Sequence, residues 1–301
     1  MARTFGIGIF APAGFAQDPE ALARAVRRLE ALGHRVIVDP ACHQRWQRFA
    51  APDADRLASV ERIAADPRVD LAIALRGGYG WTRLLPQIDF DAIARSEKRW
   101  LGYSDFTAFQ FAAMAKTGMK SFAGPSFTGD FGADKPSAFM LEHCFGLLGA
   151  SNYAVECDLD GPEIPATAGT LWGGNLAMVA HLAGTPYFPR IDHGILFLED
   201  VGEHPYRVER MLYQLHHAGV LARQRAILLG QFTEYELNGN DVGYDFNTVV
   251  THLRDLVPPV PVFTGLPFGH VPDKLTLPFG GQCALEVGQG RARLTFSDYG
   301  G

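Results

Sequence analysis

Leu101-Gly102-Tyr103-Ser104-Asp105-Phe106-Thr107-Ala108 is the turn at which a short apolar strand passes directly into a helix. The serine of this turn is lifted out of the backbone, and the N–H groups that begin the helix point toward it. Such a hydroxyl is accessible as a nucleophile, and the amides can stabilise an oxyanion. The alternative is that Ser104 or Asp105 only caps the helix, since the full Gly-x-Ser-x-Gly elbow is absent.

Around this turn, the first half of the chain alternates strand and helix patterns. Apolar strands are predicted at residues 5–10, 34–38, 69–75 and 100–103, with helices at 18–32, 56–65 and 106–117. Strands separated by helices of this length indicate βαβ units and a mostly parallel sheet. In an α/β fold of this kind, binding sites form at the carboxyl ends of the strands.

The second half of the chain has a different composition and a different order of predicted elements. Residues 151–167 are polar and interrupted by proline and glycine, which predicts a linker between an N-terminal domain (1–150) and a C-terminal domain (168–301). Further strands are predicted at 194–198, 226–232 and 260–265, a helix at 206–218, and short strands near the end. We therefore expect a parallel-sheet N-terminal domain and a smaller, mixed α/β C-terminal domain.

Composition narrows the function classes. The 301 residues carry a net charge of −6 and no Lys/Arg-rich stripe, which argues against nucleic acid as a partner. No apolar run reaches membrane-spanning length, and the opening residues lack the pattern of a signal peptide. The four cysteines are scattered, without metal-ligand spacing. These features predict a cytoplasmic protein with free thiols that needs no metal or other cofactor.

A serine nucleophile needs a base, which is usually a histidine oriented by a carboxylate. His270 follows a predicted strand in a tight Pro-Phe-Gly-His turn, where glycine and proline can fix an imidazole. Glu199 ends another apolar strand, and a buried carboxylate there needs a partner. The partner of Glu199 can also be an arginine such as Arg207, and Glu203 is its rival for a catalytic role.

A glycine-rich segment, Arg76-Gly77-Gly78-Tyr79-Gly80, follows the strand at 69–75. It lacks the residues of a P-loop or a dinucleotide fingerprint. Its amides are candidates for an oxyanion donor, while Arg76 either anchors the loop or holds a substrate carboxylate. Trp81 either forms an apolar wall for a small substrate side chain or packs at the domain interface.

Several segments resemble the LD-carboxypeptidases, a family of serine peptidases. The matching segments occur in the family's order at residues 76–86, 102–108, 124–125, 169–176, 198–212 and 265–270. The resemblance implies a Ser104–His270–Glu199 triad, with His270 as general base and Glu199 orienting its ring. It also implies an oxyanion hole formed by the N–H of Asp105 and that of Gly77 or Gly78. The active site would lie between the two domains.

The family resemblance also implies a function. We expect a hydrolase that releases terminal D-alanine from cytoplasmic murein tetrapeptides in peptidoglycan recycling, and that forms a homodimer. The alternative within the family is an immunity-type amidase that acts on peptidyl- or aminoacyl-nucleotides. The compact length and the segment Glu203-His204-Pro205-Tyr206 favour the murein branch. A non-enzymatic murein-binding protein would have lost the triad residues, and all three are present.

Overall fold

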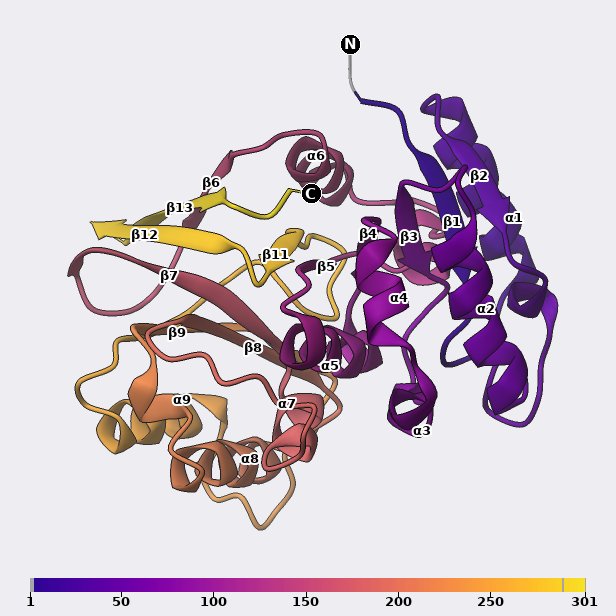
Figure 1. The fold of residues 1–301 in the computed structure, drawn as a ribbon. Helices are drawn as coiled ribbons and strands as arrows, with labels where there is room; N and C mark the ends of the chain where they lie inside the picture. The colour runs from indigo at the N-terminus through magenta and orange to yellow at the C-terminus, as the bar shows by residue number, and fades with distance from the viewer. Residues whose placement is uncertain (1–2, 289, 301) are drawn as a thin grey trace.

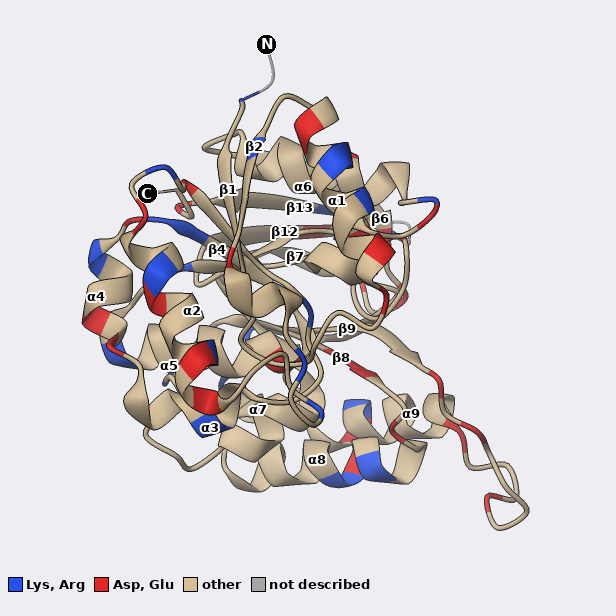
Figure 2. Ribbon diagram, turned by 90° about the vertical axis from the view of Figure 1, so that its right-hand side faces the viewer, with Lys and Arg blue, Asp and Glu red and all other residues tan. Residues whose placement is uncertain are grey.

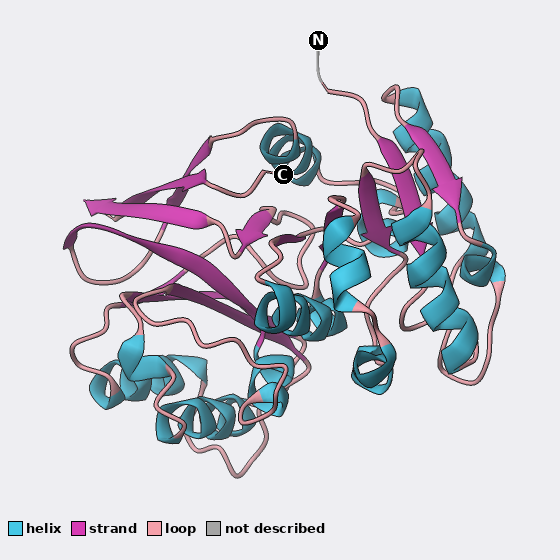
Figure 3. Cartoon of the chain, in the orientation of Figure 1, coloured by secondary structure: helices cyan, strands magenta, loops and turns pink. Residues whose placement is uncertain are grey.

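Two β-sheets with surrounding helices form the protein (Figures 1 and 3), in a computed structural model that describes residues 3–288 and 290–300. The first sheet has the order β11-β5-β4-β3-β1-β2. Its strands are β1 (Gly6–Phe10), β2 (Arg35–Val38), β3 (Leu71–Ala74), β4 (Arg99–Gly102), β5 (Ser121–Ala123) and β11 (Leu277–Phe279). All neighbours pair in parallel except β11, which is antiparallel to β5.

Helices cover both faces of this sheet. Figure 2 shows α2, α4 and α5 on one side and α1 and α6 on the other, with acidic and basic residues interspersed along the helices. Their bounds are α1 (Pro19–Ala31), α2 (Asp53–Ala65), α3 (Trp81–Leu84), α4 (Phe90–Arg95), α5 (Thr107–Thr117) and α6 (Ala138–Leu148). In α1, Asp18 caps the first turn, and Ala21, Leu22, Ala25 and Leu29 form the buried face at helical spacing.

The second sheet has the order β10-β9-β8-β7-β12-β13-β6. Its strands are β6 (Tyr153–Asp158), β7 (Ile164–Asn175), β8 (Ile195–Val201), β9 (Ala226–Thr233), β10 (Val262–Thr264), β12 (Gln282–Gly288) and β13 (Arg291–Ser297). The part from β10 to β7 is parallel, and the part from β7 to β6 is antiparallel. The helices that belong to this half are α7 (Leu176–Leu182), α8 (Pro205–His217) and α9 (Phe246–Leu256).

The expected linker at 151–167 is wrong as a structural description. These residues contain β6 and the start of β7, which are paired strands of the second sheet. The polar composition arises because β6 is largely exposed and lies at the edge of the sheet. The two-sheet α/β architecture agrees with the predicted fold class.

The two halves are joined by more than one crossing of the chain. Strand β11, which follows the C-terminal half, completes the first sheet beside β5. Helix α5 of the first half packs against α7 and β7 of the second. Figure 1 shows α5 next to α7, where the two halves meet.

Candidate active site

Ser104 lies directly after β4, where the short 3-10 turn Ser104–Phe106 leads into α5. Its φ is 63°, in the left-handed region that residues with a side chain rarely adopt. Backbone strain of this kind costs of the order of 1–3 kcal/mol and occurs preferentially at functional sites. The turn therefore presents the hydroxyl at the carboxyl edge of the sheet.

Gly77 approaches this turn closely. A Cβ atom at residue 77 would lie 2.9 Å from Ser104 Cβ and 3.0 Å from Ser104 Oγ, so only glycine fits without displacement. A Cβ at Gly78 would instead meet the backbone of Gly14 at 3.8 Å. Of the two glycines that the sequence left open, Gly77 is the one whose backbone lies against the serine.

Asp105 connects the two loops. Its side chain is buried, and Oδ2 accepts a hydrogen bond of 3.1 Å from the N–H of Trp81, at the end of the glycine-rich segment. Its second oxygen, Oδ1, has no hydrogen-bond partner. Burial raises the pKa of Asp105 to about 7, and the Trp81 N–H and the charge of Arg56 oppose this shift. The carboxyl thus holds the glycine loop against the serine turn.

The raised pKa predicts a pH-dependent stability. Between pH 4 and 7, folded Asp105 keeps a proton that the unfolded chain releases, because the unfolded pKa is near 3.8. Asp105 should therefore lower the free energy of unfolding as pH rises, by at most about 1.4 kcal/mol per pH unit. Asp105→Asn should flatten this decline, as measured by urea unfolding from pH 4.5 to 7.5. An unchanged slope in the variant would contradict the assignment.

Glu199 and His270 form a buried pair. Glu199 lies in β8 with its side chain fully buried, and its Oε2 lies 2.8 Å from His270 Nδ1. The sequence placed Glu199 at the end of its strand, whereas β8 extends two residues further, through Val201. Gly269, with a φ of 139°, lets the backbone pass so close that a Cβ there would lie 3.3 Å from Glu199 Oε2. The rival acid, Glu203, instead pairs with Arg207 at 3.7 Å.

Two further polar residues support this glutamate, and the sequence analysis assigned them no role. Asn175 ends β7, and its Nδ2 donates to Glu199 Oε1 at 3.3 Å and to Asp200 Oδ1 at 2.8 Å. The N–H groups of Ala177 and Val201 also donate to Asp200. In the sequence, the feature that could have identified Asn175 was its position as a polar residue at the end of a strand. The network fixes the carboxylate that in turn fixes the imidazole.

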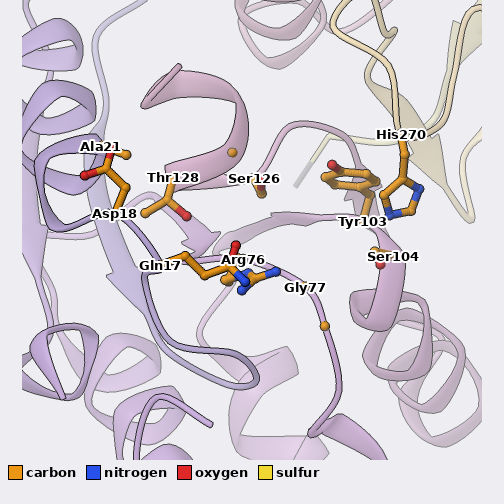
Figure 4. Close-up of a pocket in the computed structure, with 12 residues that line it drawn as sticks. Gln17, Asp18, Ala21, Arg76, Gly77, Tyr103, Ser104, Ser126, Thr128 and His270 are labelled. Atoms are coloured by element: carbon orange, nitrogen blue, oxygen red, sulfur yellow. The ribbon is translucent and has the colours of Figure 1, made fainter. Parts of the chain in front are cut away.

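A pocket of about 230 Å³ brings the candidate residues together. It is lined by Gln17, Asp18, Ala21, Arg76, Gly77, Gly78, Tyr103, Ser104, Ser126, Thr128, Gly129 and His270. Figure 4 shows the rings of His270 and Tyr103 next to each other near Ser104, while Arg76 extends between Gln17 and Gly77. Within residues 3–288 and 290–300, no hydrogen bond joins the Ser104 hydroxyl to His270. Such contacts often tighten only when substrate binds.

Arg76 is a free cation in this pocket. Its Nη1 donates one long hydrogen bond, of 3.4 Å, to the carbonyl of Phe15, and no carboxylate pairs with it among the described residues. Burial lowers its pKa, but an arginine remains charged at neutral pH. A half-buried guanidinium without an acidic partner is suited to bind an anionic group of a ligand.

Trp81 does not line the pocket, so the expectation of a substrate wall is wrong. Its side chain is 1% exposed and packs against the rings of Phe10, Phe106 and Phe109. The indole is therefore part of the core beneath the serine turn.

In the part of the chain that the structure describes, no three His, Cys, Asp or Glu side chains are grouped as around a metal ion, and no helix is long and apolar enough to cross a membrane.

Both halves of the chain match domains of one known protein family. Residues 7–124 match the LD-carboxypeptidase N-terminal domain, and residues 168–285 match its C-terminal domain. The murein tetrapeptide carboxypeptidase of Pseudomonas aeruginosa is 29% identical, with 93% of this chain and 92% of that protein covered.

Solved structures show the same likeness. The muramoyltetrapeptide carboxypeptidase of Oxalobacter formigenes superposes with a TM-score of 0.93 at 45% identity, covering 98% of this chain and 100% of that one. A microcin C7 self-immunity protein superposes with a TM-score of 0.89 at 24% identity, covering 100% and 98%, which shows a shared fold. The domain matches and the full-length identity of 45% establish that this chain belongs to the LD-carboxypeptidase family.

Proposed function

We propose that the protein is a serine LD-carboxypeptidase that releases the terminal D-alanine from murein tetrapeptides during peptidoglycan recycling. The observation that carries the proposal is the His270–Glu199 pair. The Glu199 carboxylate is hydrogen-bonded to Nδ1 of the imidazole. Nε2 therefore remains available to the pocket that His270 shares with Ser104. Similarity to the P. aeruginosa murein tetrapeptide carboxypeptidase and its O. formigenes counterpart supports the substrate class.

In this mechanism, His270 takes the proton of the Ser104 hydroxyl as the oxygen attacks the carbonyl carbon of the scissile amide. The resulting oxyanion accepts hydrogen bonds from the N–H groups of Asp105 and Gly77. His270 then donates the proton to the nitrogen of D-alanine, which leaves. Water, deprotonated by His270, cleaves the acyl-enzyme and releases the shortened peptide. Glu199 orients the imidazole and stabilises its charged form throughout.

The proposal assigns the terminal carboxylate of the substrate to Arg76. A carboxypeptidase must recognise a free carboxylate, and a guanidinium can bind both of its oxygens. The free cation of Arg76 lies in the serine pocket beside Gly77, and that pocket is small enough to favour a small leaving residue.

The test is mass spectrometry of purified protein with three peptides. The free tetrapeptide should lose D-alanine, with or without EDTA, and an all-L analogue should not react. A tetrapeptide with an amidated terminus should react roughly ten- to a hundredfold more slowly, because about 1.5–3 kcal/mol of charged hydrogen bonding is lost. Equal cleavage of the free and amidated peptides would contradict recognition by Arg76. It would favour the alternative, an amidase acting on peptidyl- or aminoacyl-nucleotides.

Two further properties belong to the proposal. A cytoplasmic location is supported by the four cysteines, which are unpaired, as expected in a reducing compartment. A homodimer is supported by the family resemblance. Sedimentation at several protein concentrations measures the second property directly.

A further inference from the structure

A buried ion pair lies beside the candidate triad and belongs to none of the steps above. Lys274 Nζ lies 2.5 Å from Asp130 Oδ1, and the two side chains are 2% and 8% exposed. Among the Lys and Arg ion pairs of residues 3–288 and 290–300, it is the one in which both partners are more than nine-tenths buried. Burying two charges is costly unless their geometry is well satisfied, so this pair requires a reason.

The pair joins the two halves of the protein. Asp130 lies in the short helical turn Phe127–Phe131 after β5, in the half that carries Ser104. Lys274 lies four residues after His270. The N–H of Leu275 donates to the carbonyl of Pro267 at 2.8 Å, which closes residues 267–275 into one compact loop around the histidine. Lys274 therefore ties the His270 loop to the serine half.

Asp130 is itself fixed on the other side. Its Oδ2 accepts hydrogen bonds from the N–H of Ser126 at 2.7 Å and from the Ser126 hydroxyl at 3.1 Å. Ser126 lines the same pocket as Ser104. One carboxylate thus holds the pocket wall through one oxygen and the His270 loop through the other.

The ammonium group also acts on the ring that supports the imidazole. Lys274 Nζ lies 4.2 Å from the ring centre of Tyr103, and the Tyr103 ring centre lies 4.9 Å from that of His270. Tyr103 directly precedes Ser104, so a cation over its ring fixes the residue between nucleophile and base. Figure 4 shows the two rings next to each other.

We propose that Asp130 and Lys274 are positioning residues that hold His270 in register with Ser104 across the boundary between the two halves. The proposal rests on the roles assigned above to Ser104 and His270. On the opposite side, Glu199 and the bond from the N–H of Gln231 to the carbonyl of Phe268 hold the same loop. The loop is therefore clamped from both halves, and releasing one clamp should misplace the imidazole.

The test compares Lys274→Met with Lys120→Met. Lys120 also joins the two halves of the protein, through Asp298 at 2.7 Å, but this pair is partly exposed and lies outside the pocket lining. Lys274→Met should lower kcat for D-alanine release about a hundredfold, as expected for a misplacement of about 1 Å, with KM changed less than about threefold. Lys120→Met should change both constants less than about twofold.

A double variant separates positioning from folding. Asp130→Asn with Lys274→Met buries no unpaired charge, and the asparagine still accepts the Ser126 hydrogen bonds. Its melting temperature should return toward that of the wild type while kcat stays low. Recovery of kcat in the double variant would overturn the proposal, as would a raised KM with unchanged kcat. If Lys274→Met does not fold, the kcat of the double variant tests the proposal in its place.

Labelling of Ser104 with a serine-reactive fluorophosphonate tests the positioning of His270 without the peptide substrate. The rate of Ser104 labelling should fall in Lys274→Met and remain unchanged in Lys120→Met. If the wild type is labelled but releases no D-alanine, the proposed function is wrong and the labelling rates still test the clamp. If the wild type releases D-alanine and both lysine variants match it, the clamp alone is wrong.

Discussion

Ser104→Ala should lower kcat/KM for D-alanine release by roughly four to six orders of magnitude, because loss of a serine nucleophile removes the covalent route. The alanine keeps the same backbone requirement, a φ of 63°, so the fold should persist. The residual rate would come from the oxyanion donors and from substrate binding. The measurement is D-alanine release by mass spectrometry under single-turnover conditions.

Ser96→Ala is the matched control. Ser96 ends α4, and its hydroxyl donates to the carbonyl of Ile93 at 2.6 Å, remote from the pocket. This variant should retain the activity of the wild type. Near-normal activity of folded Ser104→Ala, verified by its melting temperature, would remove Ser104 from the mechanism.

The second large effect concerns the base and its carboxylate. His270→Ala should lower kcat by roughly four to six orders of magnitude, because the variant lacks the base that takes the serine proton. Glu199→Gln should be milder, by roughly two to four orders, because Glu199 orients the ring without carrying the transferred proton. The kcat of each variant is measured in the same D-alanine release assay, and circular dichroism verifies that each variant folds.

Glu203→Gln is the control for the acid. Its pair with Arg207 is partly exposed and joins the residue before the N-cap of α8 to the first turn of that helix, so the variant should stay within about twofold of the wild type. If Glu203→Gln were as damaging as His270→Ala and Glu199→Gln were mild, the two acids would have to exchange roles.

The parallel core of the first sheet was predictable because its strands are short, apolar and separated by amphipathic helices. Strand β3 and helix α1 lie within a few residues of their predicted bounds. Strand β6 was not predictable, because an exposed edge strand has the polar composition of a linker. Strand β11 was not assigned to the first sheet either, because its pairing with β5 depends on contacts between residues far apart in sequence.

The site shows the same division. Ser104 and His270 stood out because each follows a strand in a constrained turn, and Glu199 because it interrupts an apolar run. Trp81 was misjudged, since it directly follows a glycine-rich loop in sequence while its contacts are core rings. Lys274 and Asp130 are 144 positions apart and carry no local pattern. Local sequence patterns therefore identify functional residues that a constrained turn positions, and they do not identify pairs that only tertiary contacts bring together.

The pairing of β11 with β5 bears on how the protein is made. While the chain leaves the ribosome, β5 has an unpaired edge that attracts other strands, and the edge is covered only after residue 279 has emerged. His270 emerges just before, in the same late segment. On the roles proposed for Ser104 and His270, the nascent chain contains the nucleophile without its base for most of its synthesis, and the base joins it in the same late step that closes the sheet.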